Sequence, residues 1–120
     1  VNMMCYIAAD AAYREGDAWL RAALDTIEAN RDFAQGFIRE HMPTLKTGTL
    51  EGTYLQWIDC RDANLPTLPG EWFLEHARVA LNEGAMFGEG GEGFVRMNLA
   101  TSRETLETAL NRMKDALDTL

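Results

Sequence analysis

One arginine stands in a segment of alternating apolar and polar residues, and its chemistry is the binding of anions. The segment 94–100 reads FVRMNLA and directly follows a glycine-rich stretch. Arg96 falls on the face opposite the apolar residues, and a guanidinium offers a planar fork that fits a carboxylate through two parallel hydrogen bonds. Arg96 could therefore anchor a substrate carboxylate, or it could be a solvated strand arginine paired with Glu89 or Glu92. The pattern alone favours the second interpretation.

The glycine-rich stretch, GEGGEG at 88–93, matches the GxGxxG spacing of dinucleotide-binding loops. Such a loop leaves a strand and opens a helix whose N-terminus holds the phosphates, whereas here a strand pattern follows. Glu89 and Glu92 would face any phosphate, and no Lys-Ser or Lys-Thr pair follows as a P-loop requires. We therefore expect a connecting loop whose glycines allow positive φ angles or a close approach of two backbones.

Other reactive side chains lack a supporting pattern. Three carboxylates could be imagined as an acid–base set, namely Asp59, Glu89 and Glu92. Nothing in the sequence fixes their separation, and acidic residues are abundant in this chain. The possible zinc ligands of the soft or imidazole type are few, namely Cys5, Cys60, His41 and His76. A structural zinc site needs about four ligands, and no serine stands in a GxSxG context, so we predict neither a metal site nor a nucleophile.

Composition narrows the class of protein. The 120 residues are 47% hydrophobic and 25% charged, which predicts a single globular domain over 1–120. Nineteen acidic residues against eleven Lys and Arg give a net charge of −8, which disfavours binding to nucleic acid or to an acidic membrane surface. No apolar run approaches the roughly 20 residues of a membrane span, and no signal-peptide pattern is present. With two cysteines, we expect a reduced, cytoplasmic protein.

Apolar residues recur at helical spacing in two long stretches. The first predicts a helix over about 17–42 with Asp17 as its N-cap. The second predicts a last helix whose N-cap is Ser102 or Thr101, with Thr101 and Glu104 spaced as a capping box.

Two shorter segments, 53–60 and 94–100, alternate as strands do. Between them we expect a short helix over 71–78, an ambiguous segment 79–82 and a loop over 84–93. The inward side chains of the short helix are expected to be Phe73, Leu74 and Ala77. Because helices and strands are interleaved, we predict an α/β (α+β) two-layer sandwich, with a small, mostly antiparallel sheet and helices on one face.

Four blocks of uncommon residues follow one another along the chain: EGTYLQWIDCR at 51–61, VALNEG at 79–84, FG at 87–88 and GEGFVRMN at 91–98. In order and spacing they are similar to signature runs of the cystathionine β-lyase (MalY/PatB) branch of the class I/II aminotransferases. Earlier residues, among them Gly16-Asp17 and Asn30, resemble the helix that enters the small domain in that family. The resemblance therefore covers nearly the whole chain.

The resemblance implies a pyridoxal-phosphate enzyme of fold type I, of which this chain is the C-terminal small domain. It implies that Arg96 binds the α-carboxylate of the amino-acid substrate, which reverses the interpretation from the pattern alone. It also implies that the cofactor forms a Schiff base with a lysine of the large domain, outside this chain. Lys46 and Lys114 are the only lysines here, and neither has the family's surroundings. We therefore expect no catalytic residue in this chain, no stably bound pyridoxal phosphate and no activity of the chain alone.

For the whole enzyme the resemblance implies a homodimer acting on a cystathionine- or cysteine-like amino acid, with either β-elimination of a thiol or transamination as the outcome. It implies that 79–82 is a short strand and that this chain packs against its own large domain. We expect the apolar start, with Met3, Met4, Tyr6 and Ile7, to be one surface that the large domain covers. A different hypothesis is a free-standing acidic α/β module that binds a partner protein through a helix face.

Overall fold

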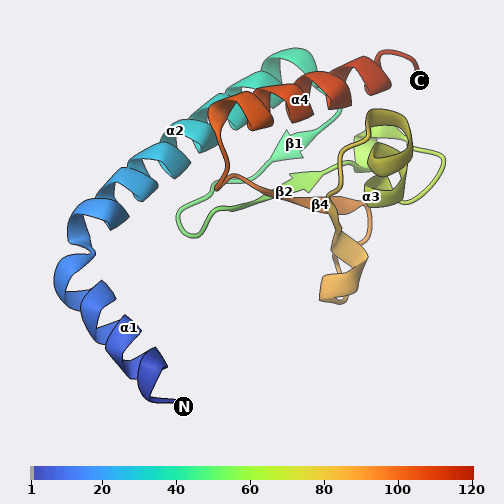
Figure 1. Ribbon diagram of the computed structural model, residues 1–120. Helices are drawn as coiled ribbons and strands as arrows, with labels where there is room; N and C mark the ends of the chain where they lie inside the picture. The colour runs from blue at the N-terminus through green and yellow to red at the C-terminus, as the bar shows by residue number, and fades with distance from the viewer. Residues whose placement is uncertain (1) are drawn as a thin grey trace.

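Two long helices lie side by side over one face of a four-stranded antiparallel sheet in the computed structural model, which describes residues 2–120 (Figure 1). The helices are α1 (Met3–Glu15), α2 (Asp17–His41), α3 (Pro69–Trp72) and α4 (Arg103–Leu117). The strands are β1 (Lys46–Thr47), β2 (Leu55–Asp59), β3 (Asn82–Glu83) and β4 (Phe94–Asn98). The predicted α/β two-layer fold is confirmed, and α2 and α4 are the helices that cover the sheet.

The sheet has the strand order β1-β2-β4-β3, and every neighbouring pair is antiparallel. The predicted alternation is confirmed in both central strands, where Gln56 and Ile58 of β2 and Val95 and Met97 of β4 are buried. Ile58, Val95 and Met97 belong to one core cluster with apolar residues of the covering helices: Ala34 and Ile38 of α2, and Leu106, Leu110 and Met113 of α4. The sheet therefore has one face in the core and one face that these two helices leave open.

A buried asparagine joins α2 to the connection between β4 and α4. The Asn30 side-chain amide donates hydrogen bonds to the carbonyl oxygens of Leu99 and Thr101, at 2.9 and 2.8 Å. Asn30 is 1% exposed, so these bonds are shielded from water. This contact fixes the start of α4 relative to the middle of α2.

The helix starts differ in part from the predicted ones. Asp17 is the first residue of α2 and not its N-cap. α1 ends at Glu15, and Gly16 joins the two helices in a right-handed helical conformation, so Gly16 is the N-cap. Of the two caps expected for α4, Ser102 is confirmed, because it accepts a hydrogen bond from the Thr105 N–H. The capping box built on Thr101 is wrong.

The short helix is also shifted from its predicted phase. It begins at Pro69 and continues through a π turn over Phe73–Ala77, which has a wider winding than an α-helix. Phe73 and Ala77 are buried as expected, and so is Trp72, whereas Leu74 is 53% exposed and the expectation that it points inward is wrong. The strand expected over 79–82 is found at Asn82 and Glu83, so only Asn82 of the expected range belongs to it.

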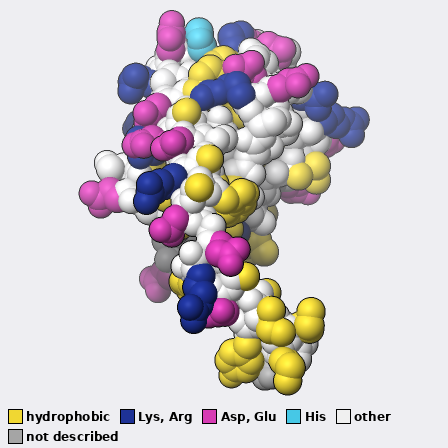
Figure 2. All heavy atoms as spheres, turned by 60° about the vertical axis from the view of Figure 1, so that its left-hand side comes forward, with side chains coloured by type: hydrophobic (Ala, Val, Ile, Leu, Met, Phe, Trp, Pro, Cys, Tyr) yellow, Lys and Arg dark blue, Asp and Glu magenta, His cyan; other side chains and the backbone are white. Residues whose placement is uncertain are grey.

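Helix α1 buries none of its side chains and projects from the sheet as an arm (Figure 1). Figure 2 shows apolar side chains gathered at the tip of this arm, where Met3, Met4, Tyr6 and Ile7 are all more than half exposed. None of the helices within residues 2–120 combines the length and apolarity needed to cross a bilayer.

Candidate carboxylate-binding site

Arg96 lies at the centre of β4, on the open face of the sheet. Its neighbours Val95 and Met97 point into the core, so the alternation of the strand turns Arg96 the other way. The sheet register places Trp57 of β2 on one side of Arg96 and Asn82 of β3 on the other. Three strands therefore position the surroundings of one half-buried guanidinium.

Two groups hold the Arg96 side chain. Nη2 donates a hydrogen bond of 3.1 Å to Oδ1 of Asn82, and Cζ lies 4.2 Å from the centre of the Phe87 ring, a distance typical of a cation–π contact. Nε is buried and has no hydrogen-bond partner among residues 2–120. The ion pair with Glu89 or Glu92 that the sequence pattern favoured is not formed.

Three aromatic rings form a row beside Arg96 on the open face. The Trp57 and Phe87 rings meet edge to face at 5.7 Å between centroids, and the Trp57 and Phe94 rings stack at 5.6 Å. At the far end of the row, Cζ of Arg61 lies 4.8 Å from the centre of the Phe94 ring. The row gives Arg96 an apolar border, in which an anionic ligand would lose water and bind more strongly.

The two arginines that border this row differ in whether a carboxylate is paired with them. Arg61 donates two side-chain hydrogen bonds to the Asp59 carboxylate, at 2.9 and 2.8 Å, and these bonds lower the pKa of Asp59. The charge of Arg61 is therefore neutralised by its own partner. Arg96 has no carboxylate partner within the described part of the chain, so its positive charge remains available to a ligand.

The glycine-rich loop brings Phe87 to this site. Gly84 and Gly91 approach so closely that a Cβ on either would overlap the carbonyl oxygen of the other. Gly88, Gly90 and Gly93 have positive φ angles of 115°, 89° and 80°. Both roles expected for the glycines are thus confirmed.

The same loop is not arranged to bind a phosphate. The Gly90 N–H donates to the Glu92 carboxylate at 3.0 Å, so a carboxylate already occupies the place of an anion. The loop leads into β4 and not into a helix, unlike a dinucleotide-binding loop.

The two lysines do not fit the cofactor that the resemblance implies. A Schiff base forms from an unprotonated amine. The Asp62 carboxylate hydrogen-bonds to Lys46 and raises its pKa, and Asp118 does the same to Lys114. Each amine is thus paired with a carboxylate that favours its protonated form, which does not suit a cofactor lysine.

The other residues considered from the sequence are not brought together. Asp59 is committed to Arg61, and no group of three or more His, Cys, Asp and Glu side chains able to hold a metal occurs in residues 2–120. His41 packs against Phe37 at the end of α2, with 4.6 Å between ring centroids, and His76 packs against Trp72 at 4.9 Å. These contacts are structural.

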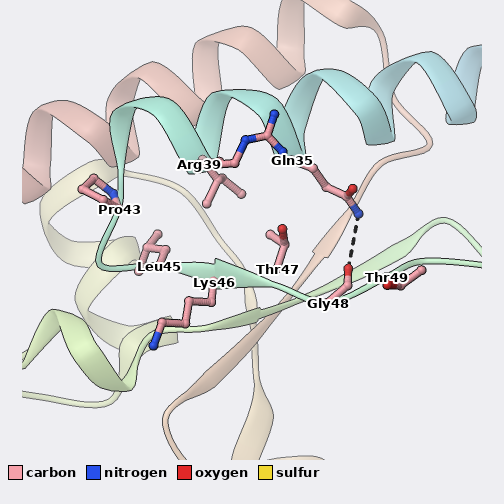
Figure 3. A pocket seen from close by; sticks show the side chains of 9 residues that line it. Gln35, Arg39, Pro43, Leu45, Lys46, Thr47, Gly48 and Thr49 are labelled. Atoms are coloured by element: carbon pink, nitrogen blue, oxygen red, sulfur yellow. Dashed lines mark hydrogen bonds between the residues drawn. The ribbon is translucent and has the colours of Figure 1, made fainter.

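A hollow of about 430 Å³ lies between α2 and β1, on the helix-covered side of the sheet (Figure 3). The Gln35 amide crosses it and donates to the Gly48 carbonyl oxygen at 3.3 Å and to Gln56 Oε1 at 2.8 Å. Arg96 does not line this hollow, and the lining contains no carboxylate, imidazole or thiol. It is therefore not part of the candidate site.

Sequence reasoning identified Arg96 but not its partners. Asn82 and Phe87 stand in two of the quoted blocks, VALNEG and FG, and those blocks were the available signal. Their contact with Arg96 depends on the pairing of β3 with β4 and on the closure of the glycine-rich loop. Neither can be read from local spacing.

Comparison with known proteins gives relatives named as cystathionine β-lyases and as aminotransferases. The chain is 35% identical to the cystathionine β-lyase of Corynebacterium glutamicum and 34% identical to the cystathionine β-lyase PatB of Bacillus subtilis, and each match covers 98% of the chain. The chain spans 31% and 30% of the lengths of these proteins. No protein-family model matches it.

The solved structure of cystalysin from Treponema denticola, which contains a pyridoxal 5'-phosphate cofactor, has a similar fold. It matches 98% of the chain with a TM-score of 0.92 at 33% identity, and the chain covers 30% of it. The fold is that of the small domain of fold type I pyridoxal-phosphate enzymes. Sequence and fold together place the chain in the cystathionine β-lyase (MalY/PatB) branch of the class I/II aminotransferase family, of whose proteins it spans about a third.

Proposed function

We propose that this chain is the carboxylate-binding part of a pyridoxal-phosphate-dependent C–S β-lyase or aminotransferase, and that Arg96 binds the α-carboxylate of its amino-acid substrate. The observation that carries the proposal is the state of Arg96. Its guanidinium stands on the open face of the sheet, is held by a neutral amide and has no carboxylate partner among residues 2–120. Such a fork can accept a carboxylate through two parallel hydrogen bonds.

The substrate class follows from the relatives. Those of Corynebacterium and Bacillus are named cystathionine β-lyases, which supports a cystathionine- or cysteine-like amino acid as the substrate. The cofactor named for cystalysin supports pyridoxal phosphate in the full-length protein. The remaining two thirds of such a protein would supply the cofactor lysine, because Lys46 and Lys114 do not fit that role.

The residues of this chain bind and orient, and do not react. Arg96 would fix one end of the substrate, while the rings of Trp57 and Phe87 exclude water from its border. Fixing the carboxylate restricts the orientation of the α-carbon, which lowers the entropic part of the barrier. We accordingly expect the isolated chain to be inactive.

The test replaces Arg96 in the full-length enzyme. We expect Arg96→Ala to lower kcat/KM for the amino-acid substrate by roughly 100-fold or more, because hydrogen bonds to charged groups contribute about 1.5–3 kcal/mol each. The kcat/KM of Arg96→Lys should lie between those of the wild type and Arg96→Ala, since lysine keeps the positive charge and lacks the planar fork. The cofactor absorbance should be unchanged in both variants.

Arg61→Ala is the matched control, because Arg61 borders the same aromatic row but is neutralised by Asp59. It should change kcat/KM by less than about threefold, as exposed ion pairs contribute little. If kcat/KM of Arg96→Ala equals that of the wild type, the proposed role of Arg96 is wrong.

A further inference from the structure

We infer that Asn82 is a positioning residue for Arg96, and that its side chain must be neutral so that the charge of Arg96 remains free for the substrate carboxylate. The inference rests on the proposed function of Arg96. It adds Asn82 to the site and requires that the side chain at position 82 accept a hydrogen bond without carrying a charge.

The sheet register brings Asn82 and Arg96 together. The two residues are direct partners in the pairing of β3 with β4, so their side chains leave the sheet at neighbouring positions on the same face. Oδ1 of Asn82 accepts the 3.1 Å hydrogen bond from Nη2. The Phe87 ring packs on the guanidinium at 4.2 Å, which fixes its plane, while the amide fixes its rotation within that plane.

The nearby pair of Arg61 and Asp59 shows what a charged acceptor would do. Asp59 takes both Nε and Nη2 of Arg61 and balances its charge. An aspartate at position 82 could accept the same hydrogen bond as Asn82, but it would also compete with the substrate carboxylate for the Arg96 fork. An amide orients a guanidinium without this competition, since it carries no charge.

Two substitutions in the full-length holoenzyme separate orientation from charge. Asn82→Ala removes the hydrogen bond and leaves Arg96 free to rotate on Phe87. Asn82→Asp restores an acceptor and adds a negative charge. We expect KM for the amino-acid substrate to rise by about fivefold in Asn82→Ala and by on the order of 30-fold in Asn82→Asp, with a smaller change in kcat.

The second measurement is selectivity for the carboxylate. The rate with the amino-acid substrate is divided by the rate with its carboxamide, which lacks the anion. This ratio of kcat/KM values should fall in both variants and fall further in Asn82→Asp. A merely structural bond would give the opposite order, because aspartate keeps the acceptor that alanine lacks.

Asn98→Asp is the matched control. Asn98 lies on β4 two residues from Arg96, on the same face, and its Oδ1 accepts from the Ala100 N–H at 2.8 Å. The change adds the same charge at an exposed position that makes no hydrogen bond to Arg96, where water weakens its effect, so KM should change by less than about threefold. A rise equal to that of Asn82→Asp would overturn the inference.

Two results distinguish this inference from the proposed function. Unchanged kinetics in Arg96→Ala would overturn both. A large effect of Arg96→Ala together with an Asn82→Asp enzyme as active as the wild type would overturn only the inference about Asn82.

Discussion

Cys60 and Cys5 are the same residue type in opposite surroundings. Cys60 is 2% exposed, and burial, with smaller contributions from the charges of Asp59 and Glu83, raises the pKa of its thiol to about 12. Cys5 lies on the exposed arm formed by α1. Because the thiolate is the reactive form, the two cysteines should differ strongly in reactivity. Arg96 and Arg61 likewise differ in their surroundings, because Arg61 is paired with the Asp59 carboxylate whereas Arg96 bonds to the neutral amide of Asn82.

We predict that a chromogenic disulfide reagent at pH 8 modifies Cys5 within minutes and modifies Cys60 only after denaturant is added. Cys5→Ser should remove the fast phase completely, which makes it the control. A fast phase that persists in Cys5→Ser would show that Cys60 is accessible.

Since the folded state holds the Cys60 proton more tightly than the unfolded state does, the free energy of unfolding should fall as pH rises from about 9 towards 12.

At the scale of elements, α2 does two different tasks along its length. Its second half packs on the sheet through Ala34 and Ile38, while Asn30 in its middle binds the two carbonyl groups that precede α4. The start of α4 is then closed by the Ser102 cap. Apolar packing is tolerant of small rotations, whereas two hydrogen bonds to fixed carbonyls are not, so Asn30 sets the relation between the helices.

We predict that Asn30→Ala lowers the free energy of unfolding by about 2 kcal/mol, because two shielded carbonyl groups lose their donor. The control is Asn111→Ala on the exposed side of α4, where the amide bonds only to the Glu107 carbonyl of its own helix. It should change stability by no more than about 0.5 kcal/mol. Urea denaturation followed by circular dichroism measures both, and equal effects would contradict the role given to Asn30.

The elements with clear periodicity could be predicted from the sequence, and the rest could not. Alternation located β2 and β4 and the faces of their side chains, because side-chain direction in a strand has a period of two. β1 and β3 contain two residues each, too few for a period to be visible. Gly48 and Gly52 indicate a turn before β2. The residue with a left-handed φ there is Thr53, at 66°, which β-branched residues rarely adopt, so the exact place of the turn could not be predicted. Arg96 was predictable as a residue, but its partners depend on pairing between distant segments.

The whole molecule measures 51 × 28 × 24 Å, an elongated shape that results from the arm formed by α1 (Figures 1 and 2). The body has its own core, with side chains from α2, β2, β4 and α4 that are almost fully buried. The arm, in contrast, exposes 76% of Met3 and 71% of Met4. The related cystathionine β-lyases are about three times as long, and we propose that in a protein of that length further residues cover these side chains.

We predict that the isolated chain self-associates through the arm as its concentration rises, because water leaves exposed apolar surface on association. Introducing Met4→Glu and Ile7→Glu together should keep it monomeric in light scattering. Thr108→Glu with Asn111→Glu on the exposed side of α4 adds the same charge and serves as the control. Equal suppression by both pairs would mean that net charge, and not the arm, governs association.

The angle between α1 and α2 at Gly16 determines where the far end of α1 lies. Gly16 has φ and ψ of −83° and −5°, which any residue can adopt, but a Cβ there would overlap the carbonyl oxygen of Ala12. A side chain at this position would therefore change the angle between the helices. Since α1 has 13 residues and is about 20 Å long, a change of about 15° at Gly16 would move its far end by about 5 Å. The absence of a side chain at Gly16 thus sets the direction of α1 relative to α2.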